Sequence, residues 1–137
     1  MIAFLAFALT ASLSSADSRT APPCGGNATR VVPLSHSGRE TLFCRLTHGG
    51  LLLSRCVSPK GTPEPQCQAT AALRSASKFE VAPLGNGRNP AAVLCKALKG
   101  TIFIGTYPNG SEQCLCGFKD QSLLSCSALI SDALPRP

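Results

Sequence analysis

Residues 89–129 have the sequence NPAAVLCKALKGTIFIGTYPNGSEQCLCGFKDQSLLSCSAL and carry the clearest secondary-structure pattern of this 137-residue chain. Asn89 and Pro90 are typical of a helix start. Apolar residues then recur at the i, i+3, i+4 and i+7 positions of one helical face: Ala91, Leu94, Cys95 and Leu98. The pattern predicts a helix over residues 90–99, ended by Gly100.

Three β-rich runs follow this helix, at residues 101–107, 113–118 and 123–129. Turn-forming residues separate them at 108–111 and 119–122, so the runs predict a three-stranded antiparallel meander. Residues 89–130 are therefore expected to form a C-terminal unit of one helix packed on one small sheet.

The preceding residues, 17–82, form a looser segment that also contains cysteines. Two β-rich runs, 40–46 and 51–57, flank Gly49 and Gly50 and predict a hairpin. Three prolines make residues 59–65 a loop, and alanines at helical spacing predict a short helix over 66–77.

The ends and the middle of the chain complete the predicted organisation. Residues 83–88 are an expected linker, and residues 131–137 are an expected disordered tail. The predicted fold class is a small, disulfide-rich α+β protein with an N-terminal hairpin segment, followed by a short helix packed on a three-stranded antiparallel meander.

The first sixteen residues contain no charge and are typical of a signal peptide, with cleavage after Ala16. No Lys or Arg precedes the apolar run, which is unusual for such a leader. A buried N-terminal helix is the alternative, although such a helix would need polar positions. We expect a secreted protein, extracellular or, in a bacterium, periplasmic.

Eight cysteines support this location, because an even set of cysteines forms stable disulfides in an oxidising compartment. They are Cys24, Cys44, Cys56, Cys67, Cys95, Cys114, Cys116 and Cys126. We expect all eight to be disulfide-bonded. The last four either pair among themselves or connect the C-terminal unit to the first segment.

A weaker pattern relates Cys44 to Cys95. Each begins a stretch with a basic residue, a glycine, three apolar residues and a Pro-x-Gly turn, and the stretches end at Cys67 and Cys114. A duplicated unit is one explanation, and chance combined with turn chemistry is the other, which we favour.

The chain shows no motif for catalysis, a metal or a cofactor. It has two histidines, His36 and His48, expected in surface loops, and no Cys-x-x-Cys pair. No nucleophile elbow, zinc-protease helix or phosphate loop is present. We therefore predict a protein that is not an enzyme and that has no cofactor or metal site.

The net charge of +6 comes from basic residues spread singly along the chain. They form no run interleaved with aromatic residues, as a nucleic-acid platform would have. We expect no nucleic-acid partner and no stable membrane insertion.

Two sequons, Asn27-Ala28-Thr29 and Asn109-Gly110-Ser111, make Asn27 and Asn109 candidate N-glycosylation sites in a eukaryotic source. Asn109-Gly110 has a second explanation, since this dipeptide favours a hairpin turn.

Part of the C-terminal unit resembles a known family. The resemblance rests on Asn89-Pro90-Ala91-Ala92-Val93-Leu94-Cys95, on Lys99-Gly100-Thr101, on Cys116-Gly117-Phe118-Lys119-Asp120-Gln121-Ser122 and on Cys126-Ser127-Ala128-Leu129. Residues 89–130 resemble a short bacterial secreted, cysteine-containing domain of unknown function that often carries the label hemolysin. Lys99 and Gln121 stand where that family prefers glycine. The resemblance implies a secreted or periplasmic, cysteine-bonded fold and no demonstrated activity.

These observations predict a small secreted, disulfide-stabilised binding or structural protein without catalytic activity. Its partner would be a protein or a cell-surface ligand. One alternative is an inhibitor of a hydrolase that acts through residues 58–66, a proline-rich loop between Cys56 and Cys67. A membrane-active, hemolysin-like protein is a further alternative.

Overall fold

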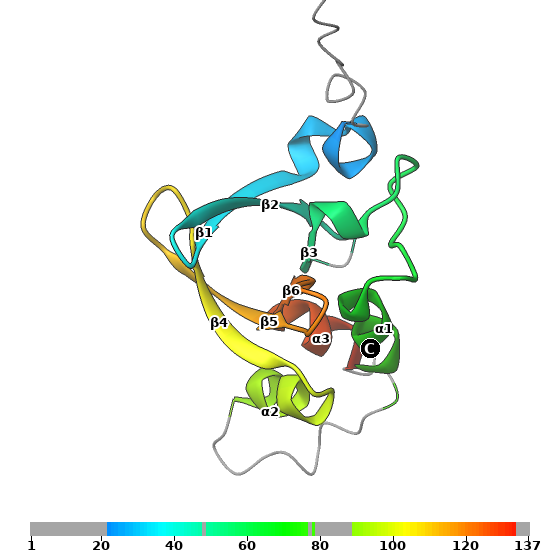
Figure 1. Ribbon diagram of the computed structural model, residues 1–137, viewed down its shortest axis with the longest axis vertical. Helices are drawn as coiled ribbons and strands as arrows, with labels where there is room; N and C mark the ends of the chain where they lie inside the picture. The colour runs from blue at the N-terminus through cyan, green and yellow to red at the C-terminus, as the bar shows by residue number, and fades with distance from the viewer. Residues whose placement is uncertain (1–21, 48, 77, 79–88, 134–137) are drawn as a thin grey trace, which may run out of the picture.

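Six strands close into an antiparallel barrel in the computed structural model, which describes residues 22–47, 49–76, 78 and 89–133 (Figure 1). The strands are β1 Val31–His36, β2 Arg39–Arg45, β3 Leu51–Leu53, β4 Thr101–Thr106, β5 Glu112–Gly117 and β6 Leu123–Ser125. Their order around the barrel is β1-β2-β3-β6-β5-β4, and β4 pairs back with β1 at Thr106 and Ser35.

Helices pack against the outside of this barrel. They are α1 Gln68–Ala76, α2 Pro90–Ala97 and α3 Cys126–Ala133, together with the short 3₁₀ turns η2 Pro23–Gly26, η3 Ala28–Arg30 and η4 Ser54–Cys56. In Figure 1, α1 and α3 lie on one side of the barrel and α2 lies beside β4.

The predicted fold, with a helix packed on a three-stranded meander, is wrong. β4, β5 and β6 do pair in sequence, but β6 also pairs with β3 at Leu124 and Leu52. A separate three-stranded sheet would have two unpaired edges, and barrel closure removes both. Strands from both sides of the expected linker 83–88, which lies outside the described residues, thus form one sheet.

Two segments account for most of the difference between the predicted fold and the barrel. β1 is absent from the predicted elements. Its sequence includes Pro33, a residue rarely found inside a strand, and in the barrel Pro33 pairs with Leu42 of β2. The predicted strand over residues 123–129 ends at Ser125, where α3 begins. A short apolar run does not distinguish a strand from a helix.

The helices predicted at residues 66–77 and 90–99 are confirmed as α1 and α2, with shorter ends. Asn89 caps α2, because its side-chain oxygen accepts a hydrogen bond from the Ala91 amide at 3.0 Å. Lys99, rather than Gly100, adopts the left-handed conformation after α2, with φ of 66°. Such a conformation costs a side-chain-bearing residue about 1 kcal/mol.

All eight cysteines form disulfides, as predicted. The pairs are Cys24–Cys44, Cys56–Cys67, Cys95–Cys116 and Cys114–Cys126. The last four cysteines therefore pair among themselves, which was one of the two alternatives. Four disulfides indicate an oxidising environment such as the extracellular space.

The two halves of the barrel repeat one order of elements, strand-strand-strand-helix: β1-β2-β3-α1 and β4-β5-β6-α3. The strand register repeats as well, because Cys44 lies opposite Leu52 as Cys116 lies opposite Leu124. The structural repeat therefore aligns Cys44 with Cys116, and not with Cys95 as the sequence pattern suggested.

The interior of the barrel is filled by side chains that alternate along the strands. Leu34 of β1 and Leu115 of β5 are fully buried. A Cβ added to Gly105 of β4 would lie 2.9 Å from Leu115 Cδ1 and 3.5 Å from Leu34 Cδ1, so these three positions face one another. Cys44 and Cys116 alternate with such positions, and their disulfides attach η2 and α2 to the outer face of the barrel.

Candidate functional site at the mouth of the barrel

A hollow of about 540 Å³ lies at one end of the barrel, and we call it the barrel mouth. Its lining consists of Leu53, Phe103, Gly117, Phe118 and Leu123, of the neutral polar residues Ser37, Thr41, Ser54 and Gln121, and of His36, Arg39 and Arg55. This volume is in the range of small-molecule sites, which often occupy the mouths of barrels. A second hollow, beside the Cys24–Cys44 disulfide, measures about 230 Å³ and falls below that range.

The β1–β2 turn positions the first two polar groups of the barrel mouth. Ser37 and Gly38 both have positive φ, of 52° and 77°, which is the two-residue turn that matches the twist of a hairpin. His36 and Arg39 flank this turn as paired residues. The His36 ring packs edge-on against Phe103 at 4.8 Å between ring centroids, so the hairpin is held over β4.

Gly117 makes room for the floor of the barrel mouth. A Cβ at this position would lie 2.6 Å from the Phe103 ring and 2.9 Å from Leu123 Cδ2. Both distances are shorter than real Cβ contacts allow. The glycine therefore lets an aromatic and an aliphatic side chain meet at the bottom of the hollow.

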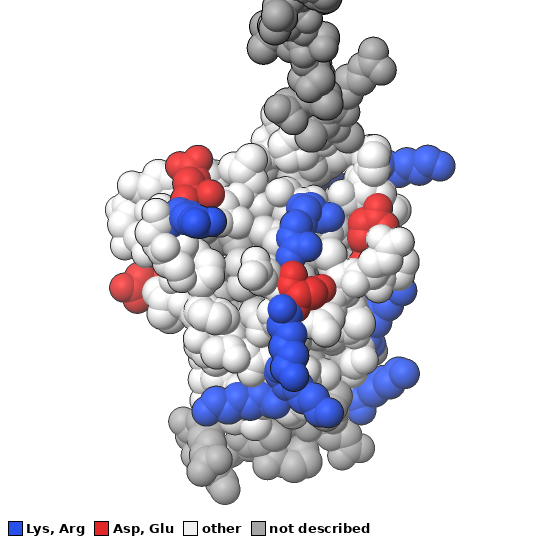
Figure 2. All heavy atoms as spheres, viewed as in Figure 1, with Lys and Arg blue, Asp and Glu red and all other residues white. Residues whose placement is uncertain are grey.

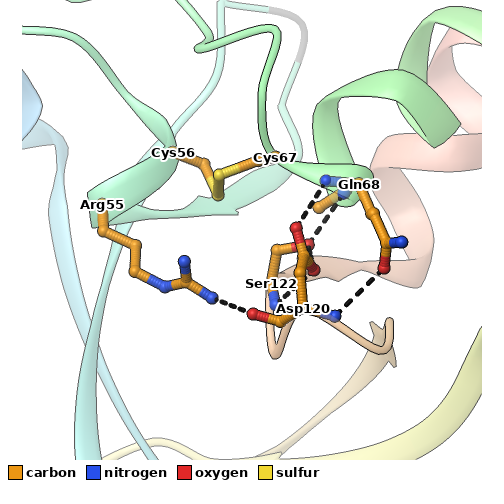
Figure 3. Close-up of a disulfide and its surroundings, with 7 residues drawn as sticks. Arg55, Cys56, Cys67, Gln68, Asp120 and Ser122 are labelled. Carbon is orange, nitrogen blue, oxygen red and sulfur yellow. Dashed lines mark hydrogen bonds between the residues drawn. A yellow bond between two sulfur atoms is a disulfide. The ribbon is translucent and has the colours of Figure 1, made fainter.

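Arg55 stands at the rim, next to the Cys56–Cys67 disulfide (Figure 3). Its guanidinium Nη2 donates a hydrogen bond to the main-chain oxygen of Asp120 at 2.7 Å. The side chain is exposed, and among the described residues its other N–H groups have no acceptor. Arg55 is thus positioned at the mouth by one hydrogen bond and keeps donors for a ligand.

Asp120 lies beside the barrel mouth without lining it, because its carboxylate caps α1. It accepts hydrogen bonds from the Gln68 amide at 2.8 Å and from the amide and hydroxyl of Ser122. Burial raises the pKa of Asp120, but these hydrogen bonds and the Arg55 charge outweigh burial and leave the pKa below its ordinary value of 3.8. The sequence suggested only that Asp120 shapes a turn.

The electrostatics of the barrel mouth favour an anion. Two arginines and a histidine line it, and its lining within the described residues includes no Asp or Glu. Apolar side chains form the other part of the lining. The arrangement is suited to a ligand that has a carboxylate or a similar group beside a ring or another apolar surface.

Among the described residues, the lining has one imidazole and no carboxylate or thiol, so it offers few of the ligands that metal sites use. In the part of the chain that the structure describes, no group of three or more His, Cys, Asp and Glu residues lies close enough to bind a metal ion. No helix within the same part is long and apolar enough to cross a membrane.

The residues predicted from the sequence lie elsewhere. The cysteines hold the scaffold, and Asn27 and Asn109 lie in exposed turns. Each asparagine side-chain oxygen accepts a hydrogen bond of 2.6 Å from the hydroxyl of its own sequon, Thr29 or Ser111. Glycosylation stays a prediction.

No family model, curated protein or solved structure matches this chain. The resemblance of residues 89–130 to the hemolysin-labelled family therefore stays a prediction.

Sequence reasoning missed the residues of the barrel mouth. His36 was expected in a surface loop, whereas it ends β1 and contacts Phe103. One signal could have found it, because Ser37-Gly38 between two β-rich runs is a hairpin pattern. The approach of Arg39, Arg55 and Phe103 depends on barrel closure, for which the sequence carried no local signal.

Proposed function

We propose that the protein is a secreted, non-enzymatic binding protein whose ligand occupies the barrel mouth, with the leader at residues 1–16 directing export. The ligand has an anionic group next to a ring or another apolar surface. One observation carries this proposal: a hollow with aromatic and aliphatic walls has three basic groups and, among its described lining, no carboxylate. Such a site favours an anion over a neutral analogue of the same shape.

Different residues of the barrel mouth would bind the two parts of the ligand. Arg39 and Arg55 would each form charge-assisted hydrogen bonds with the anion, which contribute about 1.5–3 kcal/mol when the group is well placed. Phe103 and Phe118 would cover the apolar face of the ligand. Disulfides and the tight 37–38 turn hold the main chain that carries these groups, which lowers the conformational entropy lost on binding.

A matched pair of small ligands tests the proposal. 4-Nitrophenyl glucuronide combines an aromatic ring with a carboxylate, and 4-nitrophenyl glucoside has the same shape without the charge. In a titration followed by ¹H–¹⁵N NMR, the glucuronide should shift the amide signals of the barrel mouth and the glucoside should bind more weakly. Equal binding of the two, or shifts confined to another surface, would contradict the proposal.

Two variants of the same strand provide a second test of the proposed function. Arg39→Gln should weaken glucuronide binding about tenfold, which corresponds to about 1.4 kcal/mol. Arg45→Gln is the matched control, because Arg45 also belongs to β2 and is exposed but does not line the barrel mouth. Equal losses in both variants would indicate a general effect of net charge and not a site.

Inhibition of a hydrolase is the second candidate function, favoured by the rigidity of the 58–66 loop. Ser58 and Thr62 close its tip through a main-chain hydrogen bond of 2.7 Å, and the Ser58 hydroxyl accepts from the Lys60 amide at 3.3 Å. The Cys56–Cys67 disulfide closes the base of the loop. Lys60 is exposed at the tip, where a protease specific for basic residues would contact it.

This second candidate has a direct test. The protein at micromolar concentration should inhibit a trypsin-like protease, and Lys60→Ala should abolish the inhibition while Lys78→Ala leaves it unchanged. Lysozyme serves as a hydrolase of another class in the same panel. Absence of inhibition of every enzyme in the panel would remove this candidate.

A further inference from the structure

Another hollow, of about 380 Å³, lies next to the barrel mouth, and we call it the lysine hollow. Its lining includes Gln68 and Ser75 of α1 and, from the other half of the chain, Leu98, Lys99, Phe118 and Lys119. Phe118 lines both hollows. The two therefore share one wall, and a ligand longer than the barrel mouth can continue over the Phe118 ring.

The wall between the hollows is held rigidly. The Phe118 amide donates to the main-chain oxygen of Ser122 at 3.0 Å, and the Gln121 amide donates to that of Phe118 at 2.9 Å. Gln121 completes this turn with φ of 66°, where the equivalent turn of the first half has Gly49 with φ of 96°. The main chain of Phe118 and Lys119 is thus held in this turn between the two hollows.

Charge on the lysine hollow has the same sign as that on the barrel mouth. Lys99 and Lys119 are both exposed there, and Lys99 keeps a left-handed conformation that favours glycine. Figure 2 shows basic side chains in a line down this face, with one acidic side chain among them. The carboxylate of Asp120, in the turn beside Lys119, is occupied by its hydrogen bonds with α1 and Ser122.

From this arrangement we infer that the natural ligand is an acidic polysaccharide, with one sugar in the barrel mouth and a later sugar in the lysine hollow. The inference rests on the proposed function of the barrel mouth and extends it. Arginines bind the first carboxylate or sulfate, Phe118 packs against the intervening ring, and Lys99 and Lys119 bind the next anionic group.

The lining favours a sugar chain over an acidic peptide. Hydroxyl and amide side chains that can bond sugar hydroxyls occur in both hollows, with Thr41, Ser54 and Gln121 in one and Gln68 and Ser75 in the other. One common mode of peptide binding pairs an extended peptide with an unpaired strand edge. Each strand of the closed barrel has a neighbour on both sides, with β1 and β4 joined at Ser35 and Thr106 and β3 and β6 joined at Leu52 and Leu124.

Chain length provides the test of this inference. Isothermal titration compares digalacturonate, hexagalacturonate and the neutral hexasaccharide maltohexaose with the intact protein. The hexagalacturonate should bind at least about tenfold more tightly than the disaccharide, because it engages both hollows at once. Maltohexaose should bind weakly, and added salt should weaken hexagalacturonate binding by screening.

A double variant tests whether the higher affinity of hexagalacturonate depends on the lysine hollow. Lys99→Gln with Lys119→Gln should remove the advantage of the hexasaccharide and leave binding of 4-nitrophenyl glucuronide unchanged. The control, Arg45→Gln with Lys60→Gln, removes the same charge at residues that line neither hollow.

The outcomes separate the inference from the proposed function. If the glucuronide binds at the barrel mouth but the hexasaccharide gains nothing, or its gain survives in the lysine variant, the inference is wrong and the proposed function stands. If neither the glucuronide nor any galacturonate binds, both are wrong. Equal binding of maltohexaose and hexagalacturonate would also overturn the inference, since charge would then play no part.

Discussion

Asp120 and Gln68 exchange two hydrogen bonds although they lie on different halves of the chain. The Gln68 amide donates to Asp120 Oδ2 at 2.8 Å, and the Asp120 amide donates to the Gln68 side-chain oxygen at 3.0 Å. Ser122 adds a third bond by accepting from the Ala69 amide at 2.8 Å. The β5–β6 turn thus caps α1 as a local capping residue would, and it also places Arg55 and Phe118 at the barrel mouth.

Loss of this cap should destabilise the fold. Asp120→Ala removes the acceptor of the Gln68 amide and should lower the free energy of unfolding by about 0.5–2 kcal/mol, the range for a lost helix cap. Urea unfolding followed by circular dichroism measures the change. Glu112→Ala, at an exposed carboxylate of β5, is the control and should have little effect.

The same carboxylate should contribute a pH-dependent part of the stability. Because the folded-state pKa of Asp120 is lowered, its contribution is present in full above the ordinary value of 3.8 and is lost as the pH falls through the folded value. The wild-type advantage over Asp120→Asn in urea midpoint should therefore be larger at pH 7 than at pH 2. An advantage that is equal at both pH values would contradict this assignment.

Substitution of Gly50 tests the contact between the first half of the barrel and α3. A Cβ at Gly50 would lie 2.6 Å from Ala128 Cα, a backbone atom of α3 that cannot rotate away. Gly50→Ala should therefore cost about 1–3 kcal/mol by overpacking. The equivalent residue of the second half, Ser122, carries a side chain and uses it to bond α1.

A second substitution checks the cause of that loss. Ala128→Gly, combined with Gly50→Ala, removes the Cβ of Ala128 but not the approach to its Cα, so stability should recover only in part. If the double variant is as unstable as the sum of the two single variants, the contact does not explain the effect.

Much of the local structure followed from the sequence. Asn89 and Pro90 marked the start of α2, and alanine spacing marked α1, because caps and helical periodicity act over a few residues. Barrel closure did not follow. It depends on the pairing of Leu52 with Leu124 and of Ser35 with Thr106, between residues that are distant along the chain and alike in many other strands. The barrel mouth depends on that closure, so its residues could not be assembled in advance.

The disulfides should carry a large share of the stability. Each typically contributes about 2–4 kcal/mol, so four together are comparable to the whole stability of a small domain, about 5–15 kcal/mol. Reduction should therefore unfold the protein, as seen in a loss of the thermal transition on addition of a strong reductant. A thermal midpoint that is unchanged by reductant would contradict this expectation.

Gly117 connects the scaffold to the proposed ligand site. Gly117→Ala should displace the Phe103 ring, which would lie 2.6 Å from the new Cβ, and move it into the barrel mouth. The variant should bind 4-nitrophenyl glucuronide at least about tenfold more weakly while losing about 1–3 kcal/mol of stability, the typical cost of overpacking. Titration at a temperature where circular dichroism shows the variant fully folded separates the two effects. Gly105→Ala is the comparison, because its Cβ would instead meet Leu115 inside the barrel and should reduce stability with little change in affinity. If the folded Gly117→Ala variant binds the glucuronide as tightly as the wild type, the ligand does not lie against Phe103.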